Sequence, residues 1–580
     1  MPGDATAMND TMSPGVTRSG KPVTVRFGDR PIATFAGQSV LAALVGAGEM
    51  ALRTTARGEQ RGVFCGMGVC QECLVDIDGQ GNQRACMTTV RDGMVVTEVA
   101  ALPEPVATDA APEWTEIAPD VLVIGGGPAG LSAASVAAET GLDVVLVDER
   151  AKLGGQFYKQ PADGFAIDET KIDAQFARGR ALIARAKKAG VRILSGMTVW
   201  ATFGAEEIVA GNATQTVVIH PKRLVLATGA YERGVPLPGW TLPGFMTTGA
   251  AQTLLRSYQM PPGKRVIVAG NGPLNLQVAA ELVRAGVKVV ALVEAAQAPG
   301  LMSAASLATM AMTAPDLVRD GAAYQSVLRR AGTPTFHRHV VVRAEGAGSV
   351  QRAVIARIDH AGHPIAGTER SFDVDVVCAG FGFLPSNEIA RTLGCRHRFD
   401  ERRGHLVAER DENGRSSLAN VWITGDSGGL GGARVAEAGG ILAGVDLAAS
   451  LGRPRQHSAE AETAMRTKVR SERFQEALWS LFSAPRLVDQ LARPDTIICR
   501  CEEVPLAALE AGLDDEIATA GALKRTTRAG MGRCQGRYCG PIAVELVARR
   551  RNSPVDEFSY FAPRVPFRPL PVSAIASRED

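Results

Sequence analysis

The sequence contains no run of 18 or more apolar residues. Its most apolar region, residues 289–314, is interrupted by Glu294 and Pro299, so we expect no transmembrane helix. The first 20 residues carry Asp4 and Asp10 and have no apolar segment of the kind that secretory signals need. We therefore expect a cytoplasmic protein, for which partner proteins would be the route to the inner face of a membrane.

An excess of one charge is also absent. Lys and Arg number 63 and Asp and Glu number 61, which gives a formal net charge of +2. Because no basic field would attract phosphate backbones, nucleic acid is not an expected partner. Aromatic residues are scarce at 5%, but 46% of the 580 residues are hydrophobic. These values exclude a mainly disordered chain and predict a folded protein of several domains.

Ten cysteines are present, and a reducing compartment would keep them out of disulfides. Cys378 and Cys395 stand alone in the sequence. The other eight form two groups. The N-terminal group, with the spacing C-x4-C-x2-C-x12-C, is Cys65, Cys70, Cys73 and Cys86. The C-terminal group, with the spacing C-x-C-x32-C-x4-C, is Cys499, Cys501, Cys534 and Cys539.

The N-terminal group has the spacing of plant-type 2Fe-2S sites. Glycines at positions 62, 66 and 68 would let the loop pass closely around a cluster. Zinc is the rival ligand, but zinc sites favour C-x2-C pairs, and only Cys70 and Cys73 form one. The spacing therefore predicts a 2Fe-2S cluster.

The C-terminal group is less diagnostic. Cys534 and Cys539 lie in a glycine-containing loop that precedes an apolar helix predicted at residues 542–547. A helix N-terminus, together with Arg500, Arg533 and Arg537, would suit a centre that becomes more negative on reduction. From these residues alone, iron-sulfur and zinc both remain open.

Residues 121–130 read VLVIGGGPAG, a G-x-G-x-x-G turn between an apolar strand and a helix. In such a turn one glycine makes the bend, the second admits a pyrophosphate and the third packs the helix on the strand, while an acid ending the next strand binds a ribose. The candidate residues are Gly125, Gly127, Pro128, Ala129, Gly130, Asp148 and Glu149. They predict a dinucleotide-binding lobe.

Two further segments are typical of flavoproteins with two dinucleotide lobes. The first contains Thr228 and Gly229, and the second contains Gly425 and Asp426, where the aspartate would lie near a ribityl chain. Three such segments in the right order predict FAD. No C-x2-C pair lies beside these motifs, so the sequence offers no residues for disulfide-reductase chemistry.

A second glycine-rich turn contains Gly270 and Gly272, but Asn275 replaces its third glycine and would hold the helix away from the strand. Glu294 follows Gly270 by 24 positions, as Glu149 follows Gly125, so ribose recognition remains open. We expect a second nucleotide here, NAD(P) or ATP, with NAD(P)H turnover the weaker expectation.

With these residues in place, the chain resembles the flavin subunit of heteromeric amino-acid dehydrogenases: hydrogen cyanide synthase, opine oxidase, D-hydroxyproline dehydrogenase and dye-linked proline dehydrogenase. The resemblance is carried by Gly155 and Gln156, by residues 226–252 and by the C-terminal cysteine segments. The first 100 residues resemble the small 2Fe-2S subunit of these systems, fused here as in sarcosine oxidase alpha. The late cysteines resemble the bacterioferritin-associated ferredoxin type of 2Fe-2S site, which implies that they are cluster ligands.

The expected fold is a multidomain α/β protein with a β-grasp ferredoxin-like domain, a two-lobed Rossmann core and a small C-terminal 2Fe-2S domain. The expected parts are a flexible tail (1–20), the ferredoxin-like domain (21–100), a linker (101–118), the FAD lobe (119–262 and 376–455), the second dinucleotide lobe (263–375), a helical connector (456–493), the C-terminal 2Fe-2S domain (494–552) and a Pro-rich arm (553–580). The arm could dock on a neighbour or on the FAD lobe of its own chain.

The resemblance implies that the substrate is oxidised on a separate FAD-dependent subunit of the amino-acid oxidase type. The sequence then predicts an electron-transfer subunit that carries FAD and two 2Fe-2S clusters and delivers electrons to a quinone or the respiratory chain. A self-contained NAD(P)H-dependent reductase and a non-catalytic iron-sulfur scaffold are the alternatives. No set of residues identifies itself as catalytic for an amino acid.

Overall fold

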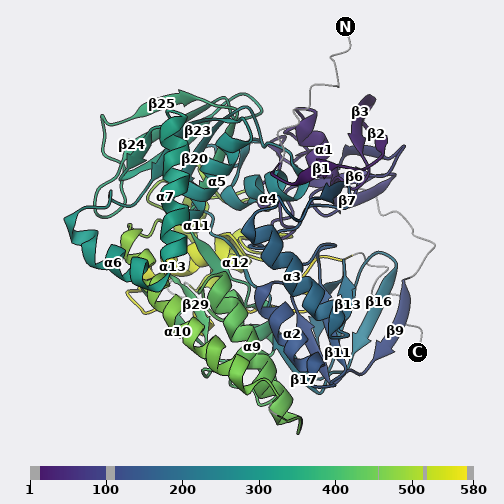
Figure 1. The fold of residues 1–580 in the computed structure, drawn as a ribbon. Coiled ribbons are helices and arrows are strands. Elements are labelled where there is room, and N and C mark those ends of the chain that lie inside the picture. The colour runs from purple at the N-terminus through teal and green to yellow at the C-terminus, as the bar shows by residue number, and fades with distance from the viewer. Residues whose placement is uncertain (1–12, 100–111, 455, 514–518, 571–580) are drawn as a thin grey trace.

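The computed structural model describes residues 13–99, 112–454, 456–513 and 519–570 (Figure 1). Residues 1–12, most of the predicted linker and residues 571–580 lie outside this description. The predicted tail is wrong for β1 (Val16–Arg18), which pairs with β12 (Phe165–Ile167) because Val16 packs against buried Phe35 and Phe165. The end of the predicted linker forms β9 (Glu113–Ile117), a strand of the FAD lobe.

The N-terminal part is a mixed sheet with strand order β3-β2-β8-β6-β7 and one packed helix (purple in Figure 1). Its elements are β2 (Pro22–Phe27), β3 (Arg30–Phe35), α1 (Val40–Gly46), β4 (Arg53–Thr54), β5 (Gln60–Arg61), β6 (Leu74–Ile77), β7 (Gln80–Arg84) and β8 (Val95–Glu98). The Ser39 hydroxyl accepts from the Ala42 N–H and so caps α1. The loop from β5 to β6 carries three of the N-terminal cysteines.

The first Rossmann lobe is a parallel sheet with strand order β13-β11-β10-β17-β30. Its elements are β10 (Val121–Ile124), α2 (Pro128–Glu139), β11 (Val144–Asp148), α3 (Ala174–Lys188), β13 (Arg192–Ser195), β17 (Arg223–Leu226), β30 (Val421–Ile423), η2 (Gly425–Gly428) and α9 (Ala433–Ser450). All four residues of β10 are buried. Val121 and Val123 face the helices, while Leu122 and Ile124 face a second sheet, so both faces of the parallel sheet are covered.

That second sheet has the order β14-β15-β16-β9. It consists of β14 (Thr198–Thr202), β15 (Ile208–Gly211), β16 (Gln215–Ile219) and β9. Smaller elements follow the chain around this lobe: β18 (Ala230–Glu232), β27 (Phe383–Pro385), α8 (Glu388–Thr392), β28 (His397–Asp400) and β29 (His405–Ala408).

The second Rossmann lobe repeats the plan with strand order β19-β26-β20-β21-β22. Its elements are β19 (Phe245–Thr247), α4 (Thr248–Tyr258), β20 (Arg265–Gly270), α5 (Pro273–Arg284), β21 (Lys288–Glu294), η1 (Leu301–Ser303), α6 (Ala304–Thr313), α7 (Pro315–Arg330), β22 (Thr335–His337), β23 (His339–Glu345), β24 (Arg352–Arg357), β25 (Arg370–Asp373) and β26 (Val376–Gly380). Residues of α4 and α1 share one hydrophobic cluster, so this lobe packs directly against the N-terminal part.

The chain then runs through α10 (Ser458–Leu481), which lies beside α9 and α6 (Figure 1). The C-terminal elements are β31 (Ile497–Cys499), β32 (Val504–Pro505), α11 (Leu506–Gly512), α12 (Ala520–Thr527), α13 (Cys539–Arg551) and η3 (Glu557–Ser559). These elements, yellow-green to yellow in Figure 1, lie toward the centre of the view, between the other parts of the chain.

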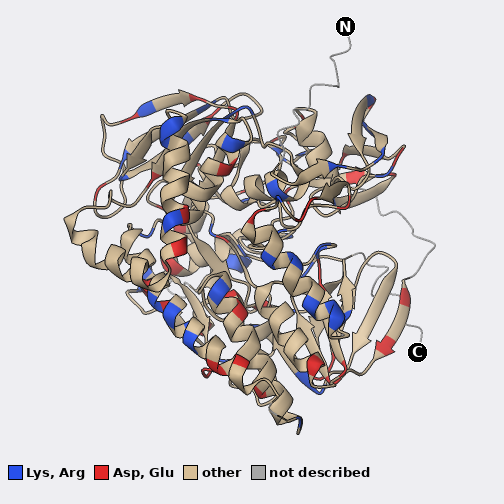
Figure 2. Cartoon of the chain, in the orientation of Figure 1, with Lys and Arg blue, Asp and Glu red and all other residues tan. Residues whose placement is uncertain are grey.

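Charges of both signs are scattered over all parts of the ribbon (Figure 2), as the balanced composition predicts. Among the described residues, no single helix has the length and apolar composition to cross a membrane. One bent pair, Leu301–Thr313 with Pro315–Arg330, meets both criteria together, with an angle of 118° between its halves.

Candidate functional site

The N-terminal cysteine group comes together in the structure, and all four thiols are buried. The N–H groups of Met67 and Cys70 point at the Cys65 sulfur, at 3.5 and 3.4 Å. Burial raises the pKa of the Cys65 thiol, but hydrogen bonds from the Cys70 thiol and from backbone N–H groups outweigh it and lower the pKa to about 6. The loop therefore favours a thiolate, which is the form that binds metal.

The C-terminal group is assembled from three segments. Cys499 ends β31, Cys501 follows it, Cys534 lies in the loop before α13, and Cys539 is the first residue of that helix. The sulfur atoms of Cys499 and Cys501 are 4.0 Å apart, and those of Cys501 and Cys534 are 3.7 Å apart. A Cβ at Gly532 would lie 2.4 Å from the Cys501 sulfur, so the loop needs glycine there to pass the group.

The first glycine-rich turn connects β10 to α2. Gly125 has φ +109°, and a Cβ at Gly130 would lie 1.8 Å from the Gly125 carbonyl oxygen. Gly127 is the N-cap of α2 and has no side-chain cap, and Pro128 in the first turn has no N–H to satisfy. The free N–H groups of this first turn fit a pyrophosphate.

The acids at the end of β11 have different partners. The Asp148 carboxylate accepts from the N–H groups of Gly126 at 2.6 Å and Arg150 at 2.7 Å, so both oxygens are used within the fold. Burial raises the pKa of Asp148 to about 6. Glu149 lies on the wall of a large cavity, and its Oε2 is 4.0 Å from Nη1 of Arg84. Glu149 is therefore the acid that can reach a ribose.

The cavity measures about 1460 Å³ and runs from the first lobe to the second. Its size exceeds that of the 300–1,000 Å³ pockets typical of small ligands and fits an extended dinucleotide. Every residue predicted for FAD lies on its wall except Gly130, which packs inside α2: the lining includes Gly125, Gly127, Pro128, Ala129, Asp148, Glu149, Gly155, Gln156, Thr228, Gly229, Gly425 and Asp426. Oδ1 of Asp426 accepts from the N–H groups of Gly431 and Gly432.

The second glycine-rich turn also lies on the cavity wall, through Gly272, but its acid does not. Glu294 is 5% exposed, and its two oxygens accept from the N–H groups of Gly272 at 3.1 Å and Ala296 at 3.0 Å. Ribose recognition by Glu294, which the sequence left open, is therefore wrong. Asn275 fills the gap left by the missing glycine: its Nδ2 donates to the Gly380 carbonyl at 2.8 Å.

Sequence reasoning missed a buried pair on the wall of the same cavity. Lys159 donates to Oε1 of Gln252 at 3.0 Å, and burial lowers the pKa of Lys159 to about 7. Glu232 accepts from the Gly249 N–H at 2.8 Å, and burial raises the pKa of Glu232 to about 7. Within the described residues Oε1 of Glu232 has no hydrogen-bond partner. No motif distinguishes the two residues, because they are 73 positions apart in the sequence.

The described part of the Pro-rich arm packs on the FAD lobe of its own chain. Phe567 is buried, and its N–H donates to the Trp200 carbonyl at 3.1 Å. The Arg537 side chain donates to the Phe567 carbonyl at 3.3 Å. Arg568 follows on the cavity wall, where the Glu149 carboxylate is one of the acids near it. The arm thus carries a cation to the cofactor end of the cavity.

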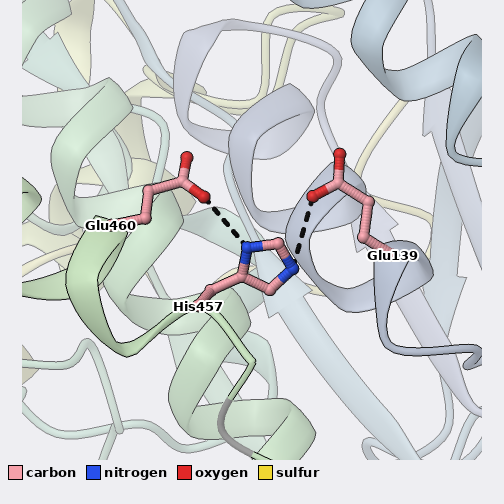
Figure 3. Close-up of side chains that lie close together, drawn as sticks. All are labelled: Glu139, His457 and Glu460. Carbon is pink, nitrogen blue, oxygen red and sulfur yellow. Dashed lines mark hydrogen bonds and ion pairs between the residues drawn. The ribbon is translucent and has the colours of Figure 1, made fainter.

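A separate acidic cluster binds α10 to the first lobe (Figure 3). His457 contacts Glu460 through Nδ1 at 3.0 Å and Glu139 through Nε2 at 3.4 Å. The three side chains have the proximity of a metal site. However, Arg185 already pairs with both carboxylates, at 2.7 Å to Glu139 and 2.5 Å to Glu460. This cluster is an ion-pair network that fixes the start of α10 against α2 and α3.

Three segments of the chain match known families. Residues 119–440 match the pyridine nucleotide-disulphide oxidoreductases. Residues 20–101 match the 2Fe-2S iron-sulfur cluster binding domain, and residues 495–579 match the sarcosine oxidase A3 domain.

Whole-length relatives agree with these matches. Hydrogen cyanide synthase subunit HcnB of Pseudomonas aeruginosa is 32% identical, over 78% of this chain and 97% of the relative. The opine oxidase A protein of Rhizobium meliloti is 31% identical, over 79% and 98%. The crystal structure of L-proline dehydrogenase from P. horikoshii superposes with a TM-score of 0.69 at 22% identity, covering 96% of this chain and 98% of that one, which shows a shared fold.

The fold and these matches define an FAD-dependent oxidoreductase subunit with a Rossmann core of the pyridine nucleotide-disulphide oxidoreductase type and an N-terminal 2Fe-2S domain. The chain belongs to the family that contains hydrogen cyanide synthase HcnB and opine oxidase A, the flavin and 2Fe-2S subunits of heteromeric amino-acid dehydrogenases. The resemblance found in the sequence motifs is thereby confirmed.

Proposed function

We propose that this chain is an electron-transfer subunit. A partner flavoprotein oxidises an amino or imino acid, of the opine or hydroxyproline type, and this chain passes the electrons to a quinone-like acceptor. The observation that carries the proposal is the position of Cys65 and Met67 on the wall of the FAD cavity. A one-electron centre in direct reach of a flavin suits electron transfer better than hydride transfer.

We further propose two 2Fe-2S clusters, in an N-terminal ferredoxin-like domain of the β-grasp type and a C-terminal domain of the bacterioferritin-associated ferredoxin type. The eight cysteines are the ligands. Seven of the eight thiols are buried and Cys501 is half-buried, and none of the eight is in a disulfide. Iron and acid-labile sulfide should therefore each approach about four per chain. Stoichiometric zinc with iron near two would restrict the claim to the N-terminal group.

A self-contained NAD(P)H-dependent reductase is the less supported function. Ala295 stands beside Glu294 where the first lobe has Glu149 beside Asp148, so the second lobe has no acid placed for a nicotinamide ribose. The Asn271 amide also donates to the Phe482 carbonyl at 3.0 Å, which brings the end of α10 to the mouth of the second turn. A nucleotide in this lobe, NAD(P) or ATP, would be held without that acid.

The experiment compares the purified chain with the chain co-expressed with its candidate partner flavoproteins. Dye reduction is assayed with proline, hydroxyproline, opines and glycine, and flavin bleaching by NADH or NADPH is followed in the chain alone. We expect substrate-dependent activity only with a partner, and slow or no bleaching by the reduced nucleotides. Rapid bleaching of the isolated chain, or amino-acid turnover without a partner, would replace the subunit proposal by a reductase or a one-chain dehydrogenase.

A further inference from the structure

The two cysteine groups, 413 positions apart between Cys86 and Cys499, meet in the folded chain. Cys65, Cys70 and Cys534 belong to one hydrophobic cluster, which also contains Tyr538. Phe64 directly precedes Cys65, and Tyr538 directly precedes Cys539. The centroids of these two rings are 5.1 Å apart at an angle of 73°, an edge-to-face contact. The residues next to one ligand from each group are therefore in direct contact.

An ion pair joins the same two loops. Arg500 lies between Cys499 and Cys501, and Glu72 lies between Cys70 and Cys73. Nε of Arg500 is 3.2 Å from Oε1 of Glu72, and the two side chains are 5% and 2% exposed. The Arg500 guanidinium carbon also lies 4.0 Å from the centroid of the Phe64 ring and 4.8 Å from that of Trp240. Arg500 thus extends from one ligand loop into the other.

Neighbouring contacts complete this interface. Arg53 pairs with the second oxygen of Glu72 at 3.1 Å. Arg61 pairs with Glu503 at 3.0 Å, and the Thr55 hydroxyl donates to the same carboxylate at 2.8 Å. Burying charges costs several kcal/mol per ion unless partners and hydrogen bonds compensate. The ion pairs of Arg500 and Arg61 both cross from the N-terminal part to the C-terminal part, so the two parts are fixed in one register.

We propose that Arg500 and Glu72, with the Phe64–Tyr538 contact, join the two cysteine groups into one electrostatically coupled unit, in which the Arg500 cation stabilises added negative charge at both groups. The inference rests on the proposed clusters. Arg500 acts as a positioning residue, since its buried charge is poorly screened and is felt over several ångströms in each direction. The unit has an order: of the eight cysteines only Cys65 lines the FAD cavity, and the C-terminal group lies behind the aromatic contact.

The test uses the full-length protein and follows each centre by EPR during a redox titration. Arg500→Gln should shift the midpoint potentials of both centres to more negative values, because the cation that stabilises the reduced state is gone. Arg500→Lys, which keeps the charge, should stay closer to the wild-type values. Arg528→Gln is the matched control: Arg528 pairs with Glu502 at 2.8 Å, beside the same loop, but its side chain is 67% exposed, so neither potential should move.

A second measurement needs no change at the junction. In the fully reduced wild type the two centres should interact magnetically, as faster spin relaxation and broadened lines, and Cys534→Ser should return the remaining signal to that of an isolated centre. A shift confined to one centre in Arg500→Gln, equal shifts in Arg500→Gln and Arg500→Lys, or two non-interacting signals in the wild type would each overturn the inference. Iron near four per chain with non-interacting signals would refute the coupling alone, whereas a missing second centre would refute the proposed clusters.

Discussion

Asp148 and Glu294 occupy equivalent positions in the two Rossmann lobes. Each is the last residue of the second strand of its lobe, and neither offers a free oxygen to the cavity, because both accept from backbone N–H groups of the adjoining turns. Strand register pairs Ile124 with Val147 and Ala269 with Val293. The next residues along the chain, Glu149 and Ala295, are therefore equivalent, and only the first lobe offers a cavity-facing acid.

This equivalence predicts different effects of removing each acid. Glu149→Ala should weaken FAD retention by about 10- to 100-fold, since about 1.5–3 kcal/mol is typical of hydrogen bonds to a charged group. The measurement is the FAD dissociation constant of the refilled apoprotein. Glu294→Gln should leave that constant unchanged and lower the free energy of unfolding by about 1–3 kcal/mol, because a buried N–H loses its acceptor. Equal FAD affinities of Glu149→Ala and wild type would refute the ribose assignment.

The sequence count of 24 residues misplaced this equivalence by one position. Between Val266 and Ile267 the pairing of β20 with β21 shifts register, which inserts one extra residue on β21. A bulge of this kind has no signature in the residue pattern, because its cause is the packing of two strands. Counting from Gly270 therefore aligned Glu294 with Glu149, while hydrogen bonding aligns it with Asp148.

Gly127→Val tests the site of the FAD pyrophosphate. A Cβ at Gly127 meets protein atoms no closer than 3.7 Å, and φ is −82°, so the variant should fold with little strain. The added side chain would instead enter the path of the pyrophosphate at the N-terminus of α2. We expect protein that melts near the wild-type temperature but lacks flavin absorbance.

The control for this variant is Gly300→Val. Gly300 has no atom within 4 Å of its added Cβ and lies in an exposed loop far along the sequence from both turns. It should retain full yellow colour. Full flavin retention in Gly127→Val as well would falsify the pyrophosphate assignment.

Cysteine replacements should divide the iron by half. Cys70→Ser or Cys534→Ser should each lower iron from about four to about two per chain and remove one of the two EPR signals. Cys395→Ala is the control, because Cys395 is buried in another cluster, beside Ser416, and belongs to neither group. Loss of iron in Cys395→Ala, or unchanged iron in Cys534→Ser, would contradict the ligand assignment.

Lys159 should make stability depend on pH. Burial lowers its pKa from 10.5 to about 7, so between these values the unfolded chain binds the proton more tightly than the folded chain does. The contribution of Lys159 to stability is greatest above pH 10.5 and declines as the pH falls from there to about 7, by at most about 1.4 kcal/mol per pH unit. Lys159→Met should therefore gain on the wild type as the pH falls from about 10 to about 7, and remain level below that.

Urea midpoints of the two proteins across this range give the measurement. Lys187→Met, which removes an exposed lysine from α3, serves as the control and should run parallel to the wild type. A constant difference between Lys159→Met and the wild type at all pH values would show that burial does not disfavour the charged form of Lys159.

The local motifs carried most of the fold into the sequence-based prediction. Glycine turns such as Gly125–Gly127 and cysteine spacings are short-range features, so they were readable without the structure. Contacts between distant segments were not. Nothing in the sequence links Arg500 to Glu72, or Lys159 to Glu232, because these pairs are defined by how whole domains pack. The arm at Arg568 is a further case, since its composition fitted docking on a neighbour equally well.

Arg568 provides the last prediction. The arm is anchored at Phe567, so the next side chain reaches the cavity wall near Glu149, where a cation can bind the anionic part of FAD. Arg568→Ala should weaken FAD retention by about 10-fold, in line with one charge-assisted hydrogen bond. Arg564→Ala, at an exposed position four residues earlier, should not change it. Equal FAD dissociation constants for both variants would leave the arm a purely structural role, and a loss shared by both would point to undocking of the arm.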